Sequence, residues 1–255
     1  MSGHSKWASI KHKKGKADVE RGKIFSKFIR EITTAAKIGG GDLSANPRLR
    51  AAIDLAKAVN MPADNIDRAV KKGTGELPGV VYDEIEYEGY GPGGVAVIVK
   101  ALTDNKNRTT AEMRHIFSKY GGNLGTAGCV AWQFLPKGII MIPRANNEED
   151  KIFSIALDGG ADDVKADDNS YQVIAPVENF DKIKKQFEAE KIQYSHAELT
   201  RVAQNTVSLD DRAAERILKM YEILEEHEDV QQVYANFDIS EDTMERLSAA
   251  VMKEE

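Results

Sequence analysis

The chain lacks several features that would define common protein classes. Its 255 residues include one cysteine, Cys129, so an internal disulfide and a zinc site built from several cysteines are excluded. The longest strongly apolar run, residues 95–99, is far shorter than a membrane-spanning helix requires. No apolar signal segment opens the chain. These absences predict a protein of the reducing cytoplasm that has no membrane partner.

Sequence motifs for common chemistries are also missing. The glycine-rich stretches 91–94 and 121–125 match neither the phosphate-binding loop nor the dinucleotide fingerprint, and turns or helix caps explain them better. The aspartates between 162 and 168 lack the glycine and final glutamate of a calcium loop. His4 and His12 have no carboxylate or thiol to complete a metal site, and Cys129 has only His115 in its segment as a base. The sequence therefore predicts a binding protein with no catalytic residues, metal or cofactor.

Charge is abundant but unevenly divided along the chain. Residues 1–75 hold sixteen Lys and Arg against seven Asp and Glu, which gives +9. The remaining residues hold nineteen against thirty-four, which gives −15. A basic head on an acidic body favours a polyanionic partner, because lysine and arginine that neutralise phosphates release condensed counterions. The alternative is a solvated basic face, which a single charge run usually is.

Residues 1–37 concentrate this positive charge, with ten Lys and Arg against three acidic residues. Residues 1–16 have no helical period and predict an extended arm that becomes ordered on binding. Trp7 lies within it and either anchors the arm on its own domain or stacks on a base or ribose. The predicted nucleic-acid-binding residues are Lys6, Trp7, Lys11, His12, Lys13, Lys14, Lys16, Arg21, Lys23, Lys27 and Arg30.

Three helices are predicted in the basic head. Residues 20–37 have apolar side chains on one arc and cations on the opposite arc, which predicts an exposed line formed by Lys23, Lys27, Arg30 and Lys37. Asn46 and Pro47 predict the start of a second helix that runs to about residue 59. The third helix is expected to start at about residue 62, and Gly73 is expected to end it.

Secondary nucleic-acid contacts are predicted on these helices and in the body. The segment 103–109 reads either as a loop with a helix cap or as a further phosphate contact. The secondary residues are Arg48, Arg50, Arg68, Lys71, Lys72, Lys106 and Arg108.

After a linker at 73–79 the hydrophobic period changes. Strands are expected near 81–87, 95–99 and 130–134, with a helix at 107–120. From residue 138 the order strand, helix, strand, strand, helix, strand is the ferredoxin-like pattern. A helix at 211–225, a strand at 230–236 and a helix from 241 remain, and the economical arrangement returns them to the middle domain.

The predicted fold is therefore α+β with three domains. The N-terminal domain, residues 1–75, is the arm plus a helical bundle. The middle α/β domain is discontinuous, at 76–136 and 204–255. The ferredoxin-like (βαββαβ) domain, residues 137–203, is inserted in it.

Several long motifs resemble the YebC/PmpR family. The match is densest in residues 1–135, and its main segments are Gly3-His4-Ser5-Lys6-Trp7, Arg21-Gly22-Lys23-Ile24-Phe25, Lys71-Lys72-Gly73-Thr74-Gly75, Tyr87-Glu88-Gly89-Tyr90-Gly91-Pro92-Gly93-Gly94 and Gly121-Gly122-Asn123-Leu124-Gly125. The resemblance implies the same three domains and a cytoplasmic, non-enzymatic role in gene expression. Members look like DNA-binding transcriptional regulators, and others look like translational activators on the ribosome.

Two main functional hypotheses follow, with the oligomeric state left open. The first is a regulator that binds promoter DNA. The second is a ribosome-associated translation factor that binds ribosomal or transfer RNA and eases stalls at proline runs. An enzyme with a site in the middle domain is the third and weakest hypothesis. The sequence contains no evident recognition helix with base-reading side chains at its start, and a lysine-rich arm with an aromatic residue suits shaped RNA at least as well as duplex DNA.

Overall fold

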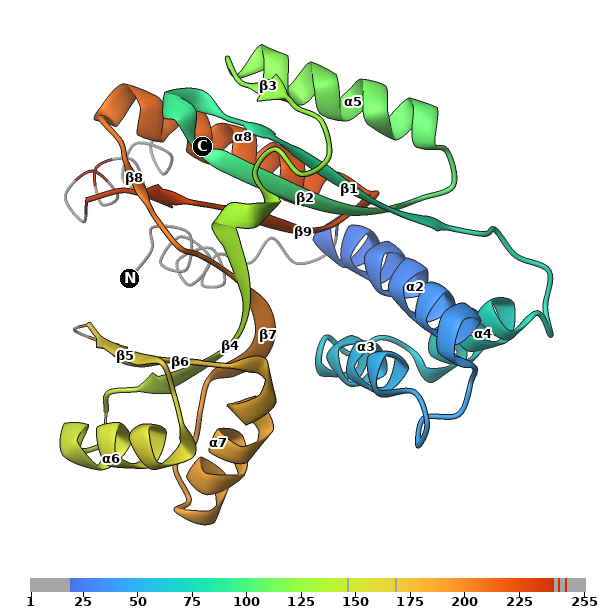
Figure 1. The fold of residues 1–255 in the computed structure, drawn as a ribbon. Helices are drawn as coiled ribbons and strands as arrows, with labels where there is room; N and C mark the ends of the chain where they lie inside the picture. Colours follow the sequence, from blue (N-terminus) through green and yellow to red (C-terminus); the bar gives the residue numbers. More distant parts are fainter. Residues whose placement is uncertain (1–18, 146, 168, 241–242, 244–245, 247–255) are drawn as a thin grey trace.

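The computed structural model describes residues 19–145, 147–167, 169–240, 243 and 246, with side chains from residue 22 onward. It has the predicted α+β class and three domains (Figure 1). A helical domain and a ferredoxin-like domain both lie against one face of the sheet in the middle domain, and two helices cover the other face. Among the described residues, no helix is both long and apolar enough to cross a membrane.

The helical domain consists of α2 (Val19–Gly39), α3 (Pro47–Ala58) and α4 (Ala63–Thr74). The side-chain carbonyl of Asn46 caps α3 by accepting a hydrogen bond from the Leu49 N–H, at 3.0 Å, as predicted. Its amide group donates to the carbonyls of Ala35 and Gly40 at 2.9 and 2.8 Å. One buried side chain therefore both starts α3 and fixes it against the end of α2.

Gly73 was expected to end the third helix, and this prediction is wrong. The helix α4 continues to Thr74, and Gly75 caps it in the left-handed conformation, with φ of 84°. Gly73 instead permits close packing, because a Cβ at this position would lie 2.4 Å from the carbonyl oxygen of Thr33 on α2.

The middle domain contains a four-stranded sheet in the order β3-β1-β2-β9. The strand β2 (Ala96–Thr103) pairs antiparallel with β1 (Asp83–Tyr90) and β9 (Val230–Ala235), and β3 (Asn123–Leu124) forms the edge. The return of β9 to β2 is the arrangement that the sequence predicts for the C-terminal segment. Of the expected helix from residue 241, the structure describes Thr243 and Arg246, and both are helical.

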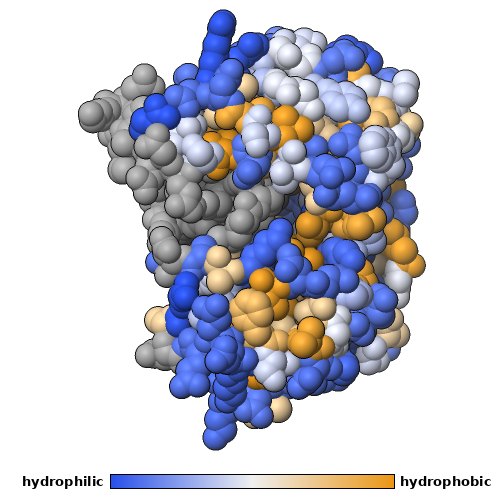
Figure 2. Space-filling view, turned by 60° about the vertical axis from the view of Figure 1, so that its left-hand side comes forward, coloured by the Kyte–Doolittle hydropathy of each residue, from blue (hydrophilic) through white to orange (hydrophobic). Residues whose placement is uncertain are grey.

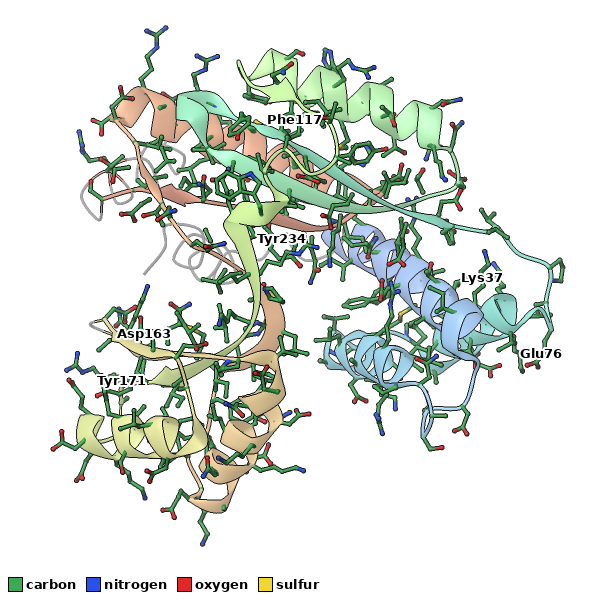
Figure 3. The ribbon with its side chains drawn as sticks, in the orientation of Figure 1. Lys37, Glu76, Phe117, Asp163, Tyr171 and Tyr234 are labelled. Carbon is green, nitrogen blue, oxygen red and sulfur yellow. The ribbon has the colours of Figure 1, made fainter. Side chains whose placement is uncertain are left out.

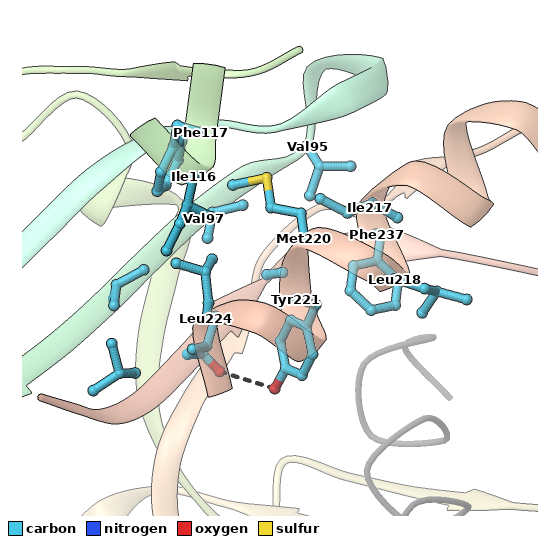
Figure 4. Packing of buried hydrophobic residues seen from close by; sticks show 14 of the residues in the cluster. Val95, Val97, Ile116, Phe117, Ile217, Leu218, Met220, Tyr221, Leu224 and Phe237 are labelled. Carbon is cyan, nitrogen blue, oxygen red and sulfur yellow. Dashed lines mark hydrogen bonds between the residues drawn. The ribbon is translucent and has the colours of Figure 1, made fainter. Parts of the chain in front are cut away.

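One face of this sheet packs on α5 (Lys106–Lys119) and α8 (Asp211–Glu226). Figure 4 shows side chains from β2, α5 and α8 interdigitating in this core, in which Phe117 and Met220 are fully buried. The Tyr221 hydroxyl, which would be costly to bury without a partner, donates to the Val233 carbonyl at 3.2 Å. The alternation of apolar residues along β2 places Val95, Val97 and Val99 on this face.

The opposite face carries a second, smaller core around Ile98 and Tyr234, which the segment after β3 covers. Residues 130–134 were predicted as a strand, and that prediction is wrong for all but Phe134, the first residue of β4 (Phe134–Pro143). The carboxylate of Glu88 accepts the backbone N–H groups of Gly128, Val130 and Ala131 at 2.6, 2.9 and 2.8 Å, so those groups are unavailable to a sheet. The chain instead forms the short 3-10 helix η2 (Ala131–Gln133).

The ferredoxin-like domain has the predicted order of elements. Its sheet order is β5-β6-β4-β7, with every neighbouring pair antiparallel. Its elements are β4 (Phe134–Pro143), α6 (Glu149–Gly159), β5 (Asp163–Ala166), β6 (Ser170–Ala175), α7 (Val177–Ala189) and β7 (His196–Ala203). Since β4 begins at Phe134, the sheet starts slightly before the boundary at 136/137 that we propose for the insert.

Three short elements complete the described fold and were not predicted. They are η1 (Pro92–Gly94), β8 (Val207–Ser208) and β10 (Phe237–Asp238). The strands β8 and β10 pair in parallel and join the segment after the insert to the end of β9.

Candidate nucleic-acid interface

The arm residues predicted to bind nucleic acid lie outside the described residues. Arg21 lies on α2, and its side chain is likewise outside the described set. The undescribed arm residues are Lys6, Trp7, Lys11, His12, Lys13, Lys14 and Lys16. The structure therefore shows the surroundings of the remaining predicted cations, which lie on α2, α3 and α4 of the helical domain and on α5 of the middle domain.

The cations of α2 do not form the predicted exposed line. Lys23 and Lys37, near its two ends, are exposed. Lys27 is half-buried and donates a hydrogen bond to the backbone carbonyl of Glu225 at the end of α8. The Arg30 side chain is only 13% exposed. The prediction of exposure is wrong for Lys27 and Arg30, because the polar arc of α2 docks on the middle domain instead of facing solvent.

Arg30 reaches a buried carboxylate, that of Asp229, whose side chain is 2% exposed. Asp229 lies in the turn between α8 and β9. Arg30 donates to its Oδ1 and also to the Leu102 carbonyl, the latter at 3.2 Å. Arg108 and Thr109 of α5 donate to its Oδ2 at 2.9 and 2.6 Å. A single aspartate thus joins the helical domain to two segments of the middle domain.

The surroundings of Asp229 keep it ionised. Burial alone would raise its pKa, but the hydrogen bonds from Thr109, Arg108 and Arg30 outweigh burial and lower the pKa from 3.8 to about 2. The pKa of Arg108 is raised, chiefly by its hydrogen bond to Asp229. A buried charge with several donors is stable only while the donors remain, so loss of one partner is costly.

The local sequence explains how α5 presents these donors. The side chain of Asn105 caps α5 by accepting from the Arg108 N–H at 3.1 Å. Thr103 Oγ1 accepts the Asn105 N–H at 2.9 Å and lies 2.7 Å from the Thr109 hydroxyl, whose one proton goes to Asp229. Segment 103–109 is therefore a helix cap that buries Thr109 and brings the half-exposed Arg108 side chain to Asp229. Lys106 stays at the surface, with its Nζ 3.7 Å from a carboxylate oxygen of Asp83.

Arg48 forms a second charged link between the two domains. Its Nε and Nη2 donate to the two carboxylate oxygens of Glu31 on α2, at 2.7 and 3.1 Å. Its Nη2 also donates to Glu84 on β1 at 2.7 Å. The hydrogen bond to Glu31, and to a smaller extent the one to Glu84, raises the pKa of the Arg48 guanidinium. We call Lys27, Arg30 and Arg48 the inward cations, because each contacts a partner on the middle domain.

Other cations of the helical domain face solvent. We call outward cations the exposed lysines and arginines of this domain that form no ion pair with any described residue. Lys71 is not among them, since its Nζ lies 2.7 Å from Asp67. The outward cations are Lys23, Lys37, Arg50, Lys57, Arg68 and Lys72.

One group of side chains near Asp229 has metal-ligand types. Ligand atoms of Glu112, His227 and Asp229 lie within 4.8 Å of one another. However, both oxygens of Asp229 already accept hydrogen bonds from guanidinium groups, and His227 Nε2 lies 2.9 Å from Glu112. A metal cation would have to displace two arginines, so this cluster favours an ion-pair junction over a metal site.

Comparisons with known proteins identify the family. Residues 5–76 match the model of the TACO1/YebC protein N-terminal domain, and residues 82–237 match the TACO1/YebC second and third domain. The chain belongs to the TACO1/YebC family. The first matched segment holds the inward cations, and the second holds their partners on the middle domain, Glu84, Glu225 and Asp229.

Relatives in this family cover almost the whole chain. A protein of Syntrophobacter fumaroxidans is 55% identical over 97% of this chain and 100% of its own length, and one of Syntrophus aciditrophicus is 56% identical over 98% and 100%. Both are named "Probable transcriptional regulatory protein". The crystal structure of a conserved hypothetical protein, Aq1575 from Aquifex aeolicus, is similar, with a TM-score of 0.77, 46% identity, and coverage of 88% of this chain and 93% of that one.

The carboxylates of the middle domain that receive Arg30 and Arg48 were not predicted from the sequence. Asp229 belongs to an acidic run that reads as a helix end and loop, and charge alone does not separate it from its neighbours. Its one distinguishing signal is position, directly before the apolar strand at 230. Glu84, the partner of Arg48, lies in an alternating strand pattern that gives it no special role.

Proposed function

We propose that this TACO1/YebC-family chain is a non-enzymatic, cytoplasmic regulator of gene expression that binds nucleic acid through its N-terminal domain. The observation that carries the proposal is the division of charge, +9 in residues 1–75 against −15 in the rest. An acidic body repels a polyanion, so binding is directed to the basic head. The names of the relatives support a regulatory role.

The outward cations add to this argument. The inward cations and Lys71 bind carboxylates or carbonyls of the protein itself. The six outward cations have no ion-pair partner among the described residues. Exposed cations of this kind are available to phosphates, and each neutralised phosphate adds to the salt-dependent part of binding. We propose that they extend the surface formed by the arm.

The state of the single cysteine, Cys129, supports a non-enzymatic role. Burial raises the pKa of Cys129, and the nearby Glu88 carboxylate raises it further. The thiol therefore remains protonated at neutral pH, which is the wrong state for a nucleophile.

RNA bound on the ribosome is the second candidate target. It is favoured by the side chains at the starts of α3 and α4. A protein that reads the DNA major groove would place its base-contacting side chains at such a helix start. The first turn of α4 carries Asp64 and no cation. The guanidinium of Arg48, in the first turn of α3, is held by Glu31 and Glu84. Arg50, the fourth residue of α3, is then the exposed arginine nearest these two helix starts, and one arginine reads at most one guanine, whereas contacts to RNA shape and phosphates need no base-reading side chain.

The arm is tested by replacing Lys11, Lys13 and Lys14 with Ala together. We expect weaker binding and a salt dependence that is shallower by about 0.9 log-log units per lost duplex contact, or about 0.7 on single strands. Fluorescence anisotropy over a series of salt concentrations measures both quantities. The control is Lys165→Ala, on the insert. An unchanged affinity and salt slope in the triple variant would refute the arm as the binding element.

The target is identified by crosslinking in cells followed by sequencing of the bound nucleic acid. Reads concentrated in ribosomal or transfer RNA support the ribosomal role. Discrete promoter peaks in DNA support transcriptional regulation. An absence of enriched nucleic acid over a strain that lacks the arm would contradict both.

A further inference from the structure

A recess opens beside the linker that joins the helical and middle domains. It encloses about 330 Å³ between α2, the end of α4 and residues 75–82. That volume is at the lower end of ligand-sized sites and exceeds the needs of a bare phosphate ion. Figure 3 shows Lys37 on α2 and Glu76 on the linker at this edge of the molecule. On the face seen in Figure 2, by comparison, hydrophobic residues form separate patches between hydrophilic ones.

Hydrogen-bond donors surround the recess. Two outward cations, Lys37 and Lys72, line it from α2 and α4. The hydroxyl oxygen of Thr34, which also lines it, is buried and has no hydrogen-bond partner in the part of the chain that the structure describes. Buried polar groups rarely remain unpartnered without a reason. Within the described residues, the backbone N–H groups of residues 79–81 also make no backbone hydrogen bond.

The opposite wall of the recess is apolar. The linker residues that line it are Leu77, Pro78, Val80 and Val81. The side chains of Leu77, Val80 and Val81 are exposed. Gly79 keeps this wall close to α4, because a Cβ there would lie 3.0 Å from the side-chain stem of Lys72. The recess therefore combines cations on the two helices with an apolar linker wall that also carries backbone amide donors.

We propose that this recess binds a nucleoside phosphate, with the phosphate at Lys37 and Lys72 and the sugar and base against the linker wall. The inference rests on the proposed nucleic-acid binding and extends it. Its ligand is either one unstacked nucleotide of a bound single strand or a free mononucleotide. Both present the same chemistry, a phosphate ester attached to a flat, weakly polar base.

The test follows methyl groups of Thr34, Val80 and Val81 by nuclear magnetic resonance in the full chain. The probes are a short single-stranded RNA, adenosine monophosphate and inorganic phosphate, each titrated separately, and RNA affinity is measured in parallel by anisotropy. We expect saturable shifts of these methyls with RNA and weaker ones with the mononucleotide. Shifts with the mononucleotide at lower concentrations than with RNA would assign the recess to free nucleotides.

Substitutions make the test specific. Lys37→Ala and Lys72→Ala should each weaken RNA binding about fivefold and remove the methyl shifts, because each deletes a charge-assisted contact. The matched control is Lys57→Ala, an outward cation of α3 that does not line the recess, which should leave the methyl shifts in place and lower affinity less than Lys37→Ala or Lys72→Ala does. Thr34→Val keeps the size and charge of the site and should weaken binding about threefold.

Each outcome decides the inference. If RNA binds while the methyls remain unshifted and Lys72→Ala behaves like Lys57→Ala, the recess is not a nucleotide site, although the proposed function stands. If no nucleic acid binds, the proposed function fails, and the mononucleotide titration alone decides the recess. Equal shifts with inorganic phosphate and the mononucleotide would overturn the nucleoside part of the assignment.

Discussion

The inward and outward cations belong to the same small domain and the same residue types, yet their surroundings differ completely. Arg30 ends on a carboxylate that is 2% exposed, whereas Arg50, on α3, projects from the surface without an ion-pair partner among the described residues. The first residue serves the junction of two domains, and the second is available to a ligand. A count of positive charge therefore overstates the surface that the helical domain offers to nucleic acid.

The largest effect is expected from Asp229→Asn. This change removes the charge that holds Arg30 and Arg108 and leaves their guanidinium groups facing an amide. We expect a loss of about 3 kcal/mol in the free energy of unfolding. Urea unfolding of the full chain measures it. The control Asp67→Asn, in the exposed pair with Lys71, should cost less than about 0.5 kcal/mol. Equal losses in the two variants would show that burial does not distinguish the inward set.

Acid should affect the inward junction in a defined pH range. The folded-state pKa of Asp229 is lowered from 3.8 to about 2, so its contribution is complete above about pH 4 and is lost as pH falls toward 2. A shift of this size corresponds to roughly 2 kcal/mol. We expect the stability difference between the wild type and Asp229→Asn to shrink over that range. A difference that does not vary between pH 5 and pH 2 would exclude this carboxylate as the cause.

A smaller loss is expected from Arg48→Ala, because this side chain is 37% exposed and solvent screens its pairs with Glu31 and Glu84. We expect about 1 kcal/mol in urea unfolding. Nucleic-acid affinity should change less than twofold if Arg48 acts only inward. A clear loss of affinity with unchanged stability would instead place Arg48 in the binding surface.

The smallest stability change is expected from the double variant Arg50→Ala and Arg68→Ala. Both side chains are exposed, so the free energy of unfolding should change by less than about 0.5 kcal/mol. Affinity for nucleic acid should fall, and the two lost contacts should make the salt slope shallower by about 1.8 log-log units on duplex, or about 1.4 on single strands. Anisotropy and urea unfolding on the same samples separate the two effects. A stability loss without an affinity loss would mean that the outward set is structural too.

Much of the fold could be predicted from local pattern. The helical period of α2, the Asn46 cap and the order of the ferredoxin-like elements depend on residues close together in sequence, and all were confirmed. The errors have non-local causes. Segment 130–134 reads as a strand until Glu88, on another strand, occupies its N–H groups. Gly73 reads as a helix end until α2 is seen packed against it.

The candidate site was harder to predict for the same reason. The amphipathic pattern of α2 shows which arc is polar, but a polar arc can face water or another domain. That choice is made by Asp229, which is 199 residues from Arg30 in the chain. No spacing rule connects such distant residues, so the inward and outward cations could not be separated from sequence alone.

The way the inserted domain joins the middle domain has a consequence for protein engineering. The strands that lead into and out of the insert are hydrogen-bonded neighbours, and Phe134 stands opposite Ala203 at their shared end. The chain thus leaves and re-enters the middle domain at points about 5 Å apart. A tight turn could bridge that distance. The insert could therefore be deleted, or replaced by another domain, with the two parts of the middle domain rejoined at this point. Phe134, buried in the middle domain, marks the cut that such a shortened protein should preserve.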